Sequence, residues 1–372
     1  MRLKVLVVPD KFKGTLTASA AAEALARGWR RARPGDELEL LPMSDGGDGF
    51  GEVIRSLIDA VPQRLQACDA AHRDCIARWW WQPNTRTAVL ETANIIGLAM
   101  LPPGRYHPFK LDTYGLGKVI EAAAAKGAKR LLVGLGGSAT NDGGFGLARS
   151  LGWEFLNSHR EPIERWVEVL NATRLQTAKA FKAPFEVIAA VDVQNPLLGP
   201  IGATCVYGPQ KGLKPTDFPL AEKCLARLAS LINRAQRTDW ARVAGAGAAG
   251  GLGFAFAAFL GGRLEPGFEL FAREAKLERR LRWADLVLTG EGAVDRSTFM
   301  GKGAGQIVRR CRALGIPCIV LAGCIDGNVP TRLRSTRIHA LTQLTTRKQA
   351  KAQPAVYLRR LAELVARNWT GK

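Results

Sequence analysis

The hydrophobic positions of this chain form short apolar runs that alternate with longer segments of helical spacing. The first run, at 3–8, is rich in β-branched residues and has the length of a buried strand. An alanine-rich segment follows, with Thr15 or Thr17 as its candidate N-cap and Pro34-Gly35 at its end. The next apolar run covers 37–41. A strand, a helix and a strand in this order predict a βαβ unit, the basis of a parallel sheet.

From about residue 61 the apolar runs become short, alternating or aromatic, which is typical of antiparallel strands. We expect strands at 61–68, 75–81, 87–92, 129–135, 185–191 and 203–207, and helices at 114–127, 143–151, 216–236 and 248–260. The parallel pattern then resumes, with strands at 284–289, 317–322 and 337–344 and helices at 303–314 and 354–369.

These elements predict two α/β domains. The first is a doubly wound, Rossmann- or flavodoxin-like parallel sheet domain formed by residues 1–60 and 282–372. The second, at 61–281, interrupts it and holds a mixed sheet.

Composition excludes several classes of protein. Apolar residues at 47% and charged residues at 23% are ordinary for a globular chain, which excludes disorder and collagen-like repeats. The seven cysteines are odd in number and form no C-x-x-C pair, so neither a disulfide framework nor a zinc site is indicated. The apolar stretch near the N-terminus is too short for an export signal, and we therefore expect a cytoplasmic protein.

The net charge of +20, from 53 basic and 33 acidic residues, predicts anionic partners. Residues 301–372 contribute +12 of it, because they hold 14 lysines and arginines but only Asp326 and Glu363. No zinc-finger, RRM or helix-turn-helix signature accompanies the charge, so no nucleic-acid partner is expected. The uncharged stretch 243–262 is half or more glycine and alanine, which favours an interior helix over a membrane span.

Polar, glycine-containing loops follow several predicted strands, where open α/β sheets bind ligands. Loop 10–15 ends at a predicted helix N-terminus, whose N–H groups favour an anion. Loop 43–49 places Asp45 and Asp48 among three glycines, and such hard oxygen ligands suit a Mg²⁺-nucleotide or a substrate hydroxyl. Loop 134–144 combines five glycines with hydroxyl, amide and carboxylate groups, and we interpret it as a phosphate cradle.

Three further loops are weaker signals, each as consistent with an ordinary turn as with a site. Loop 192–196 follows a strand with a polar sequence. Loop 208–212 places a lysine between glycines, where its charge suits a phosphate. Loop 289–295 contains two acids, and Lys302 follows it.

Taken in order, these loops resemble the signature of the type 1 glycerate kinase family. The matching segments are Pro9-Asp10 with 12–14, 44–49, 136–144, Asp192 with 195–197, 208–212, and 290–292 with Asp295, and the segments Glu91-Thr92 and 113–115 fit as well. The resemblance spans nearly the whole chain. Three positions depart from the family pattern, namely Lys11, Ala293 in place of arginine and Ala304 in place of proline.

The resemblance implies ATP-dependent phosphorylation of D-glycerate with Mg²⁺, in a cleft between two domains, with 2-phosphoglycerate as the expected product. D-glycerate and ATP are then the small-molecule partners, with neither nucleic acid nor membrane expected. The oligomeric state, monomer or homodimer, stays open. Phosphoryl transfer needs a proton acceptor, cations at the phosphates and a positioned nucleotide.

We assign those roles as follows. The catalytic candidates are Lys13 and, as alternative bases, Asp45 and Asp192; the metal ligands are Glu291 and Asp295. The nucleotide-binding candidates are Gly136, Gly137, Ser138, Thr140, Asn141, Asp142, Gly143, Lys211 and Lys302.

Three alternatives stay open at this point. The basic charge fits a nucleic-acid-binding protein, and the loops fit a kinase that acts on another small hydroxy acid. Segment 245–250 matches the dinucleotide fingerprint G-x-G-x-x-G of an NAD-dependent oxidoreductase. This segment follows a predicted helix, not the strand that the fingerprint requires, which argues against the oxidoreductase.

Overall fold

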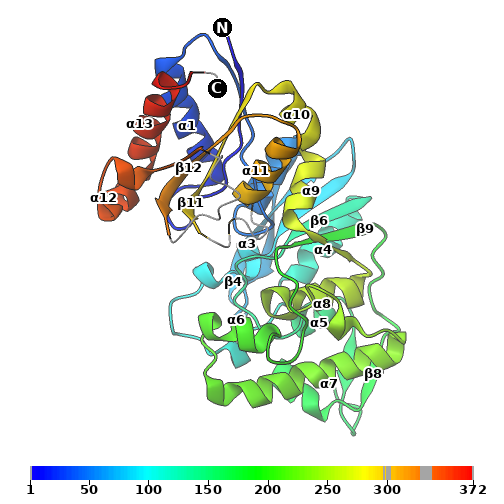
Figure 1. Cartoon of the computed structure of the whole chain (residues 1–372). Helices are drawn as coiled ribbons and strands as arrows, with labels where there is room; N and C mark the ends of the chain where they lie inside the picture. The colour runs from blue at the N-terminus through cyan, green and yellow to red at the C-terminus, as the bar shows by residue number, and fades with distance from the viewer. Residues whose placement is uncertain (1, 296–297, 299–302, 327–336, 371–372) are drawn as a thin grey trace. The chain divides into compact units, whose positions relative to one another are not determined.

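The computed structural model describes residues 2–295, 298, 303–326 and 337–370 (Figure 1). Its internal contacts divide the chain into two units. Unit 1 comprises Met1–Asp45 and Phe268–Lys372, and unit 2 comprises Gly46–Gly267. Within the described residues, each helix is too short or too polar to span a bilayer.

Unit 1 is built on a parallel sheet of five strands in the order β13-β12-β11-β1-β2. The strands are β1 (Lys4–Val7), β2 (Glu37–Leu40), β11 (Leu286–Val294), β12 (Cys318–Ile325) and β13 (Arg337–Ala340). Counted along this unit, the order is 2-1-3-4-5, which is the flavodoxin-like doubly wound arrangement. The strand order reverses between β1 and β11, and such a switch point is where these sheets bind ligands.

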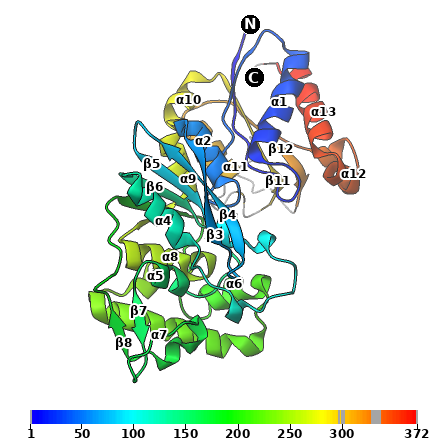
Figure 2. The same cartoon turned by 180° about the vertical axis from the view of Figure 1, so that it is seen from behind.

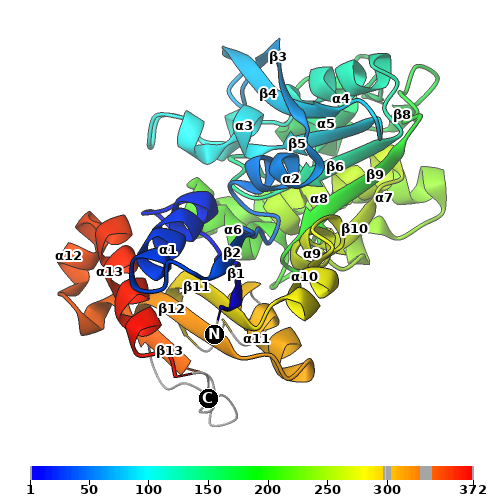
Figure 3. The same ribbon diagram turned by 90° about the horizontal axis from the view of Figure 1, so that it is seen from above.

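Helices cover both faces of this sheet (Figure 3). They are α1 (Ala18–Ala32), α9 (Gly267–Glu274), α10 (Leu277–Trp283), α11 (Gly303–Ala313), α12 (Arg347–Ala352) and α13 (Pro354–Arg367). On one face, α1 and α13 lie side by side over Val5, Leu288 and Leu321 (Figures 1 and 2). On the other face, Val308 of α11 packs against Val320.

The start of α1 follows directly from its sequence. Thr17 has extended backbone, and its side-chain oxygen accepts a hydrogen bond from the Ala20 N–H at 3.1 Å, as an N-cap does. The alanines that follow Thr17 form a buried face of α1. Gly28 has no side chain, so the backbone of α13 can approach α1 closely at this position.

Unit 2 contains a mixed sheet of six strands in the order β10-β9-β6-β5-β4-β3. The strands are β3 (Val61–Cys68), β4 (Asp74–Gln82), β5 (Thr87–Glu91), β6 (Arg130–Gly134), β9 (Glu186–Val191) and β10 (Arg263–Pro266). Strands β5, β6, β9 and β10 are parallel, and β3 and β4 continue the sheet antiparallel. A small antiparallel pair, β7 (Glu154–Leu156) and β8 (Arg174–Gln176), lies apart.

The helices of unit 2 are α2 (Phe50–Ile58), α3 (Ala93–Ile96), α4 (Leu116–Ala125), α5 (Phe145–Ser150), α6 (Ala203–Lys211), α7 (Phe218–Gln236) and α8 (Ala248–Leu260). Short 3-10 helices of the chain lie at Leu98–Met100, Pro108–Lys110, Trp166–Asn171, Pro215–Asp217, Trp240–Arg242 and Leu341–Gln343. Alternate residues of β6 face opposite sides, so that Leu131 and Val133 join the large core with Ile120 and Phe145.

The predicted fold class is confirmed: one parallel doubly wound sheet and one mixed sheet, each in an α/β unit. The expected domain limits at 60/61 and 281/282 stay a prediction. The contact-based limits fall earlier, at 45/46 and 267/268. One reason is that α2 packs on β5 of unit 2, where Phe50 lies so close to Gly134 that a Cβ there would come within 2.6 Å of its ring.

The strand predicted at 203–207 is wrong, because these residues open helix α6. A five-residue apolar run does not distinguish a strand from a helix. The buried positions Ala203, Thr204, Gly208 and Lys211 instead recur at helical spacing. The strand predicted at 337–344 ends at Ala340, where a 3-10 turn begins.

Close packing of α1 on α13 makes Gly28→Ala destabilising. The added Cβ would lie 2.1 Å from the Arg359 carbonyl oxygen, so the helices must separate. We expect a loss of about 1–3 kcal/mol in the free energy of unfolding, despite the better helix propensity of alanine. Urea denaturation measures it. Gly35→Ala, whose Cβ meets nothing within 4 Å, is the control, and equal stability of the two variants would contradict the prediction.

Candidate functional site

Three carboxylates gather at the switch point of unit 1, and we call Asp10, Asp45 and Glu291 the acidic cluster. Pairing continues beyond the strand ends, since the Asp10 N–H donates to the Gly290 carbonyl oxygen at 2.8 Å and the Met43 N–H to that of Pro9 at 3.0 Å. The loop after β1 therefore runs beside β11, and the loop after β2 runs beside the loop after β1. Asp10 and Glu291 are each only 8% exposed.

The acidic cluster carries an excess of negative charge. The pKa of Asp10 is raised to about 7, mainly by burial, then by the charge of Asp45 and to a lesser extent by that of Glu291. The Lys11 N–H, which donates to Asp10 Oδ1 at 2.7 Å, and the Lys11 charge act in the opposite direction. A bound cation would relieve this repulsion.

Glycine residues allow neighbouring backbone segments to lie close to the acidic cluster. Gly303 begins α11, and a Cβ there would lie 3.3 Å from Asp10 Oδ2. Gly292 lies against the loop after β1, where a Cβ would come within 3.2 Å of the Lys13 backbone nitrogen. The Lys13 side chain itself is exposed.

The donor set of the acidic cluster suits Mg²⁺. This ion commonly takes one or two protein carboxylates and fills its remaining positions with water and phosphate oxygens. Among the described residues, no group of three His, Cys, Asp or Glu side chains could hold a metal ion. At most two carboxylates of the cluster could therefore contact one ion, and phosphate or water oxygens would have to complete its coordination.

The pairing of Glu291 with Asp295 as metal ligands stays a prediction. Strand β11 extends through Val294, which places these two residues about 13 Å apart along the chain. Asp295 Oδ1 accepts a hydrogen bond from the Thr298 N–H at 3.2 Å, in the turn that ends the strand. The charge of Glu291 also acts on Asp10. Lys302 lies outside the described residues.

In unit 2, the glycine-rich loop 134–144 follows β6 and is held by a buried lysine. Lys211 Nζ donates to Ser138 Oγ at 3.0 Å and to the Thr140 carbonyl oxygen at 2.5 Å. Ser138 Oγ in turn donates to the Ala249 carbonyl oxygen at 2.7 Å. Lys211 ends helix α6 rather than lying in the glycine-flanked turn that the sequence predicts, and burial lowers its pKa to about 7.

Asp142 fixes the other end of the same loop. Its Oδ2 accepts hydrogen bonds from the Thr113 N–H at 3.0 Å, the Thr113 hydroxyl at 2.8 Å and the Gly146 N–H at 3.0 Å. It thereby satisfies an N–H of the first turn of α5. Burial and then the charge of Asp112 raise the pKa of Asp142 to about 6, although these hydrogen bonds oppose the shift. The contacts of this carboxylate are thus internal to the protein.

Several backbone groups of the loop are already engaged. The Ala139 N–H donates to the Ile96 carbonyl oxygen at 2.8 Å, and the Gly143 N–H to that of Gly250 at 3.1 Å. The Gly136 N–H is 3.4 Å from the Gly46 carbonyl oxygen, and Gly137 has φ of +75°. These contacts define the loop's shape, and the assignment of Gly143 to the nucleotide stays a prediction.

Two side chains of the loop keep unused polar atoms. Thr140 and Asn141 are completely buried, and Asn141 Nδ2 donates to Thr204 Oγ1 at 3.1 Å. Thr140 Oγ1 and Asn141 Oδ1 have no hydrogen-bond partner in the part of the chain that the structure describes. Since a buried unpaired polar atom costs on the order of 1–3 kcal/mol, fold stability alone does not explain them. They are consistent with a bound polar group at this loop.

The second candidate base, Asp192, is exposed at the end of β9. Burial and then the charge of Asp192 raise the pKa of Tyr207 on α6. The Tyr207 hydroxyl donates to Asn195 Oδ1 at 2.6 Å, which ties the loop after β9 to the helix that carries Lys211.

Sequence reasoning missed several residues of these sites. The sequence predicts Asp10 only as part of an anion-binding loop. An acid that follows a buried strand is, however, itself an indication of a ligand-binding position. Segment 245–250, set aside as a false fingerprint, supplies the Ala249 carbonyl and the close approach of Gly250. A Cβ at Gly250 would lie 2.0 Å from the Thr140 carbonyl oxygen. Glu91 accepts hydrogen bonds from the Gly49 and Gly51 N–H groups at 2.8 and 2.9 Å, and so caps α2.

These features define a two-unit α/β protein with polar sites at the carboxyl ends of parallel strands. The model of the glycerate kinase family matches residues 5–370, and the chain belongs to this family. A glycerate kinase from Halalkalibacterium halodurans is 35% identical over 327 residues, covering 86% of this chain and 85% of the relative. A glycerate 2-kinase from Escherichia coli is 31% identical over 330 residues, covering 88% and 87%.

The fold agrees with a solved member of the family. A crystal structure from Salmonella typhimurium LT2, provisionally named as a glycerate kinase 2, superimposes with a TM-score of 0.82. It covers 98% of each chain at 29% identity. The similarity therefore extends over both units.

Lys211 makes the stability of the protein depend on pH. Its pKa is about 7 when folded and 10.5 when unfolded, so the unfolded chain binds more protons between these values. The free energy of unfolding should rise with pH in that window, by up to about 1.4 kcal/mol per unit. Urea denaturation at pH 7, 8 and 9 should show this rise in the wild type and lose it in Lys211→Met.

The exposed Lys223, on α7, provides the control. Lys223→Met should retain the wild-type rise. Parallel curves for the wild type and Lys211→Met would contradict the prediction.

Proposed function

We propose that this protein catalyses the ATP-dependent phosphorylation of D-glycerate, giving 2-phosphoglycerate and ADP, with Mg²⁺ as the metal. The observation that carries the proposal is the family match over residues 5–370, which includes both the acidic cluster and the glycine-rich loop. The named relatives, a glycerate kinase and a glycerate 2-kinase, point to the same substrate.

In the proposed reaction, the acidic cluster would bind the metal ion. One or two of the carboxylates of Asp10, Asp45 and Glu291 would hold Mg²⁺ together with phosphate and water oxygens, because no three such side chains among the described residues could hold an ion. When bound, the ion neutralises charge on phosphate oxygens. In the resting protein, the Lys11 N–H orients Asp10 through Oδ1.

Asp192 is then the better of the two candidate bases, since the metal role accounts for Asp45. In the transfer, the C2 hydroxyl oxygen of glycerate forms a bond to the γ-phosphorus, the bond to the ADP oxygen breaks, and the hydroxyl proton passes to a carboxylate. The exposed carboxylate of Asp192 is accessible to a substrate, as this role requires.

Lys211 shapes the phosphate loop in this proposal rather than binding phosphate itself. Its ammonium donates to Ser138 and Thr140 and is nearly inaccessible, with 6% of the residue exposed. The exposed Lys13 is the side chain that we assign to ligand contact.

A coupled ADP-release assay tests the proposed activity. We expect turnover with D-glycerate, ATP and Mg²⁺, and its loss on chelation of the metal. Lactate, which lacks the C3 hydroxyl, and 3-hydroxypropionate, which lacks the C2 hydroxyl, show which oxygen is required. ³¹P NMR of the product identifies the phosphorylated carbon. Absence of glycerate-dependent ADP release would refute the proposal, and a 3-phosphate would refute its regiochemistry.

Two substitutions separate the base from the metal ligands. Asp192→Asn should lower kcat by about 10²–10⁴-fold, as loss of a general base does, with little change in the Mg²⁺ requirement. Glu291→Gln should instead raise the Mg²⁺ concentration for half-maximal rate at least tenfold. Steady-state kinetics with varied Mg²⁺ measure both effects.

The exposed Asp74 on β4 gives a matched control, and Asp74→Asn should behave like the wild type. Near-wild-type turnover of Asp192→Asn would remove Asp192 as the base. An unchanged Mg²⁺ requirement in Glu291→Gln would remove Glu291 as a ligand.

A further inference from the structure

Two exposed arginines face each other on the hairpin of β3 and β4, at the edge of the unit 2 sheet (Figures 2 and 3). Every residue of β3 has a partner on β4, and Arg64 lies directly opposite Arg78. Side chains opposite each other in an antiparallel pair have Cβ atoms about 4.5–5.5 Å apart. The two guanidinium groups can therefore reach the same ligand.

Strand alternation directs these arginines away from the core. Ala77 and Trp79, on either side of Arg78, belong to the large core of unit 2, so Arg78 projects from the other face of the sheet. Helix α2 covers that face at Trp80, since a Cβ at Gly51 would lie 2.0 Å from the Trp80 ring. Beyond Trp80 this face of the hairpin is exposed.

The described residues do not balance the charge of the arginine pair. Neither Arg64 nor Arg78 forms a hydrogen bond or an ion pair with the described part of the chain. Asp74 projects from the same face of β4 but lies four residues from Arg78, about 13 Å along the strand. Glu52 of α2 pairs with Arg55 at 2.6 Å. Like charges directly opposite each other destabilise a sheet, and a bound anion would offset this repulsion.

The two guanidinium groups suit a phosphate monoester. Guanidinium groups bind phosphate oxygens through paired N–H donors. A phosphate monoester carries a charge of roughly −1.5 to −2 at neutral pH, which balances the pair, whereas a carboxylate or a phosphodiester carries only one charge.

The surroundings of the pair add a donor and an apolar surface. Gln66, two residues from Arg64, has an exposed side-chain amide. Ile76 lies opposite Gln66 and is 52% exposed, which offers an apolar contact to the organic part of an ester. We infer that Arg64 and Arg78 bind the phosphate group of a small phosphate monoester.

Ligand-detected ¹⁹F NMR with 4-fluorophenyl phosphate tests the inference. We expect saturable binding to the full chain. Methyl 4-fluorophenyl phosphate, a diester with one negative charge, should bind at least fivefold more weakly. Absence of saturable 4-fluorophenyl phosphate binding, or equal affinity for the two probes, would overturn the inference.

Variants locate the bound probe. Arg64→Gln and Arg78→Gln should each weaken the binding of 4-fluorophenyl phosphate at least fivefold, because each leaves a single guanidinium. Wild-type affinity in either variant would overturn the inference.

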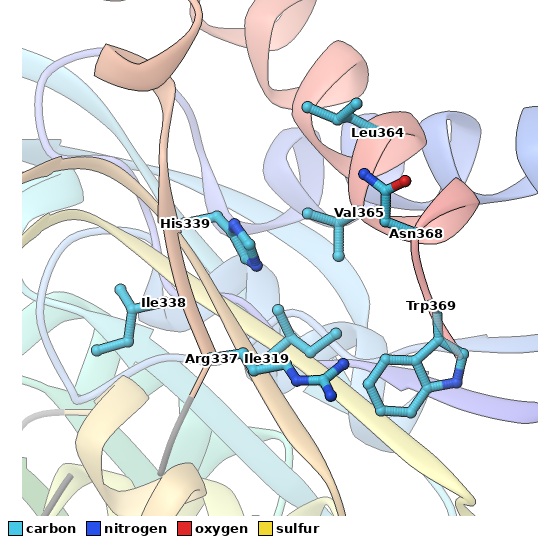
Figure 4. Close-up of a pocket in the computed structure, with 8 residues that line it drawn as sticks. All are labelled: Ile319, Arg337, Ile338, His339, Leu364, Val365, Asn368 and Trp369. Atoms are coloured by element: carbon cyan, nitrogen blue, oxygen red, sulfur yellow. The ribbon is translucent and has the colours of Figure 1, made fainter. Parts of the chain in front are cut away.

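Arg337 provides a matched control, because it is an exposed strand arginine that pairs with Ile319 rather than with another arginine. It lines a pocket of about 340 Å³ in unit 1, where its guanidinium lies over the Trp369 ring, 4.9 Å from the centroid (Figure 4). Arg337→Gln should bind the probe like the wild type. A loss equal to that of Arg64→Gln would overturn the inference.

Thermal unfolding gives a second readout that a general effect of charge would not reproduce. In chloride buffer, Arg64→Gln removes one of two opposed charges, so its Tm should equal or exceed that of the wild type. Adding 4-fluorophenyl phosphate should raise the Tm of the wild type more than that of Arg64→Gln. A lower Tm of the variant in chloride, or an equal rise in both proteins, would overturn the inference. These readouts do not depend on catalysis, so they stay interpretable if the proposed kinase activity fails.

Discussion

Parallel pairing of β1 with β11 is the constraint on which the acidic cluster depends. Val7 pairs with Leu288 across a separation of about 280 residues, and hydrogen bonds past the strand ends carry this register to Asp10 and Gly290. The reversal of strand order beside β1 leaves room for polar groups above the sheet. Three carboxylates in that position repel one another, and a bound cation would offset this repulsion.

In the glycine-rich loop of unit 2, a buried network of internal hydrogen bonds fixes the conformation of the backbone. Lys211 holds two of its residues and Asp142 anchors its end on α5. Both ionisable groups have pKa values displaced toward neutrality by burial. A loop held in this way is preorganised, which reduces the entropy lost when a ligand binds.

Local patterns anticipated most of the fold. The Thr17 cap, the apolar strands and the change at residue 61 are encoded by neighbouring residues, and the structure has the corresponding elements. The wrong strand at 203–207 has a physical cause. The run 203–207 is too short to have a period of its own, and its helical form is decided by packing of Ala203 and Thr204 in the core.

By itself, the sequence determined the order of the polar loops and the residue types in them, because strand and turn preferences are local. Only the tertiary structure decided which of these groups meet. The charge of Glu291 acts on Asp10, far away in the chain, and Lys211 is buried against the loop whose phosphate the sequence predicts it to bind. The physical reason is that strand pairing and burial join residues far apart in the chain, and no local pattern encodes a partner 71 or 281 residues away.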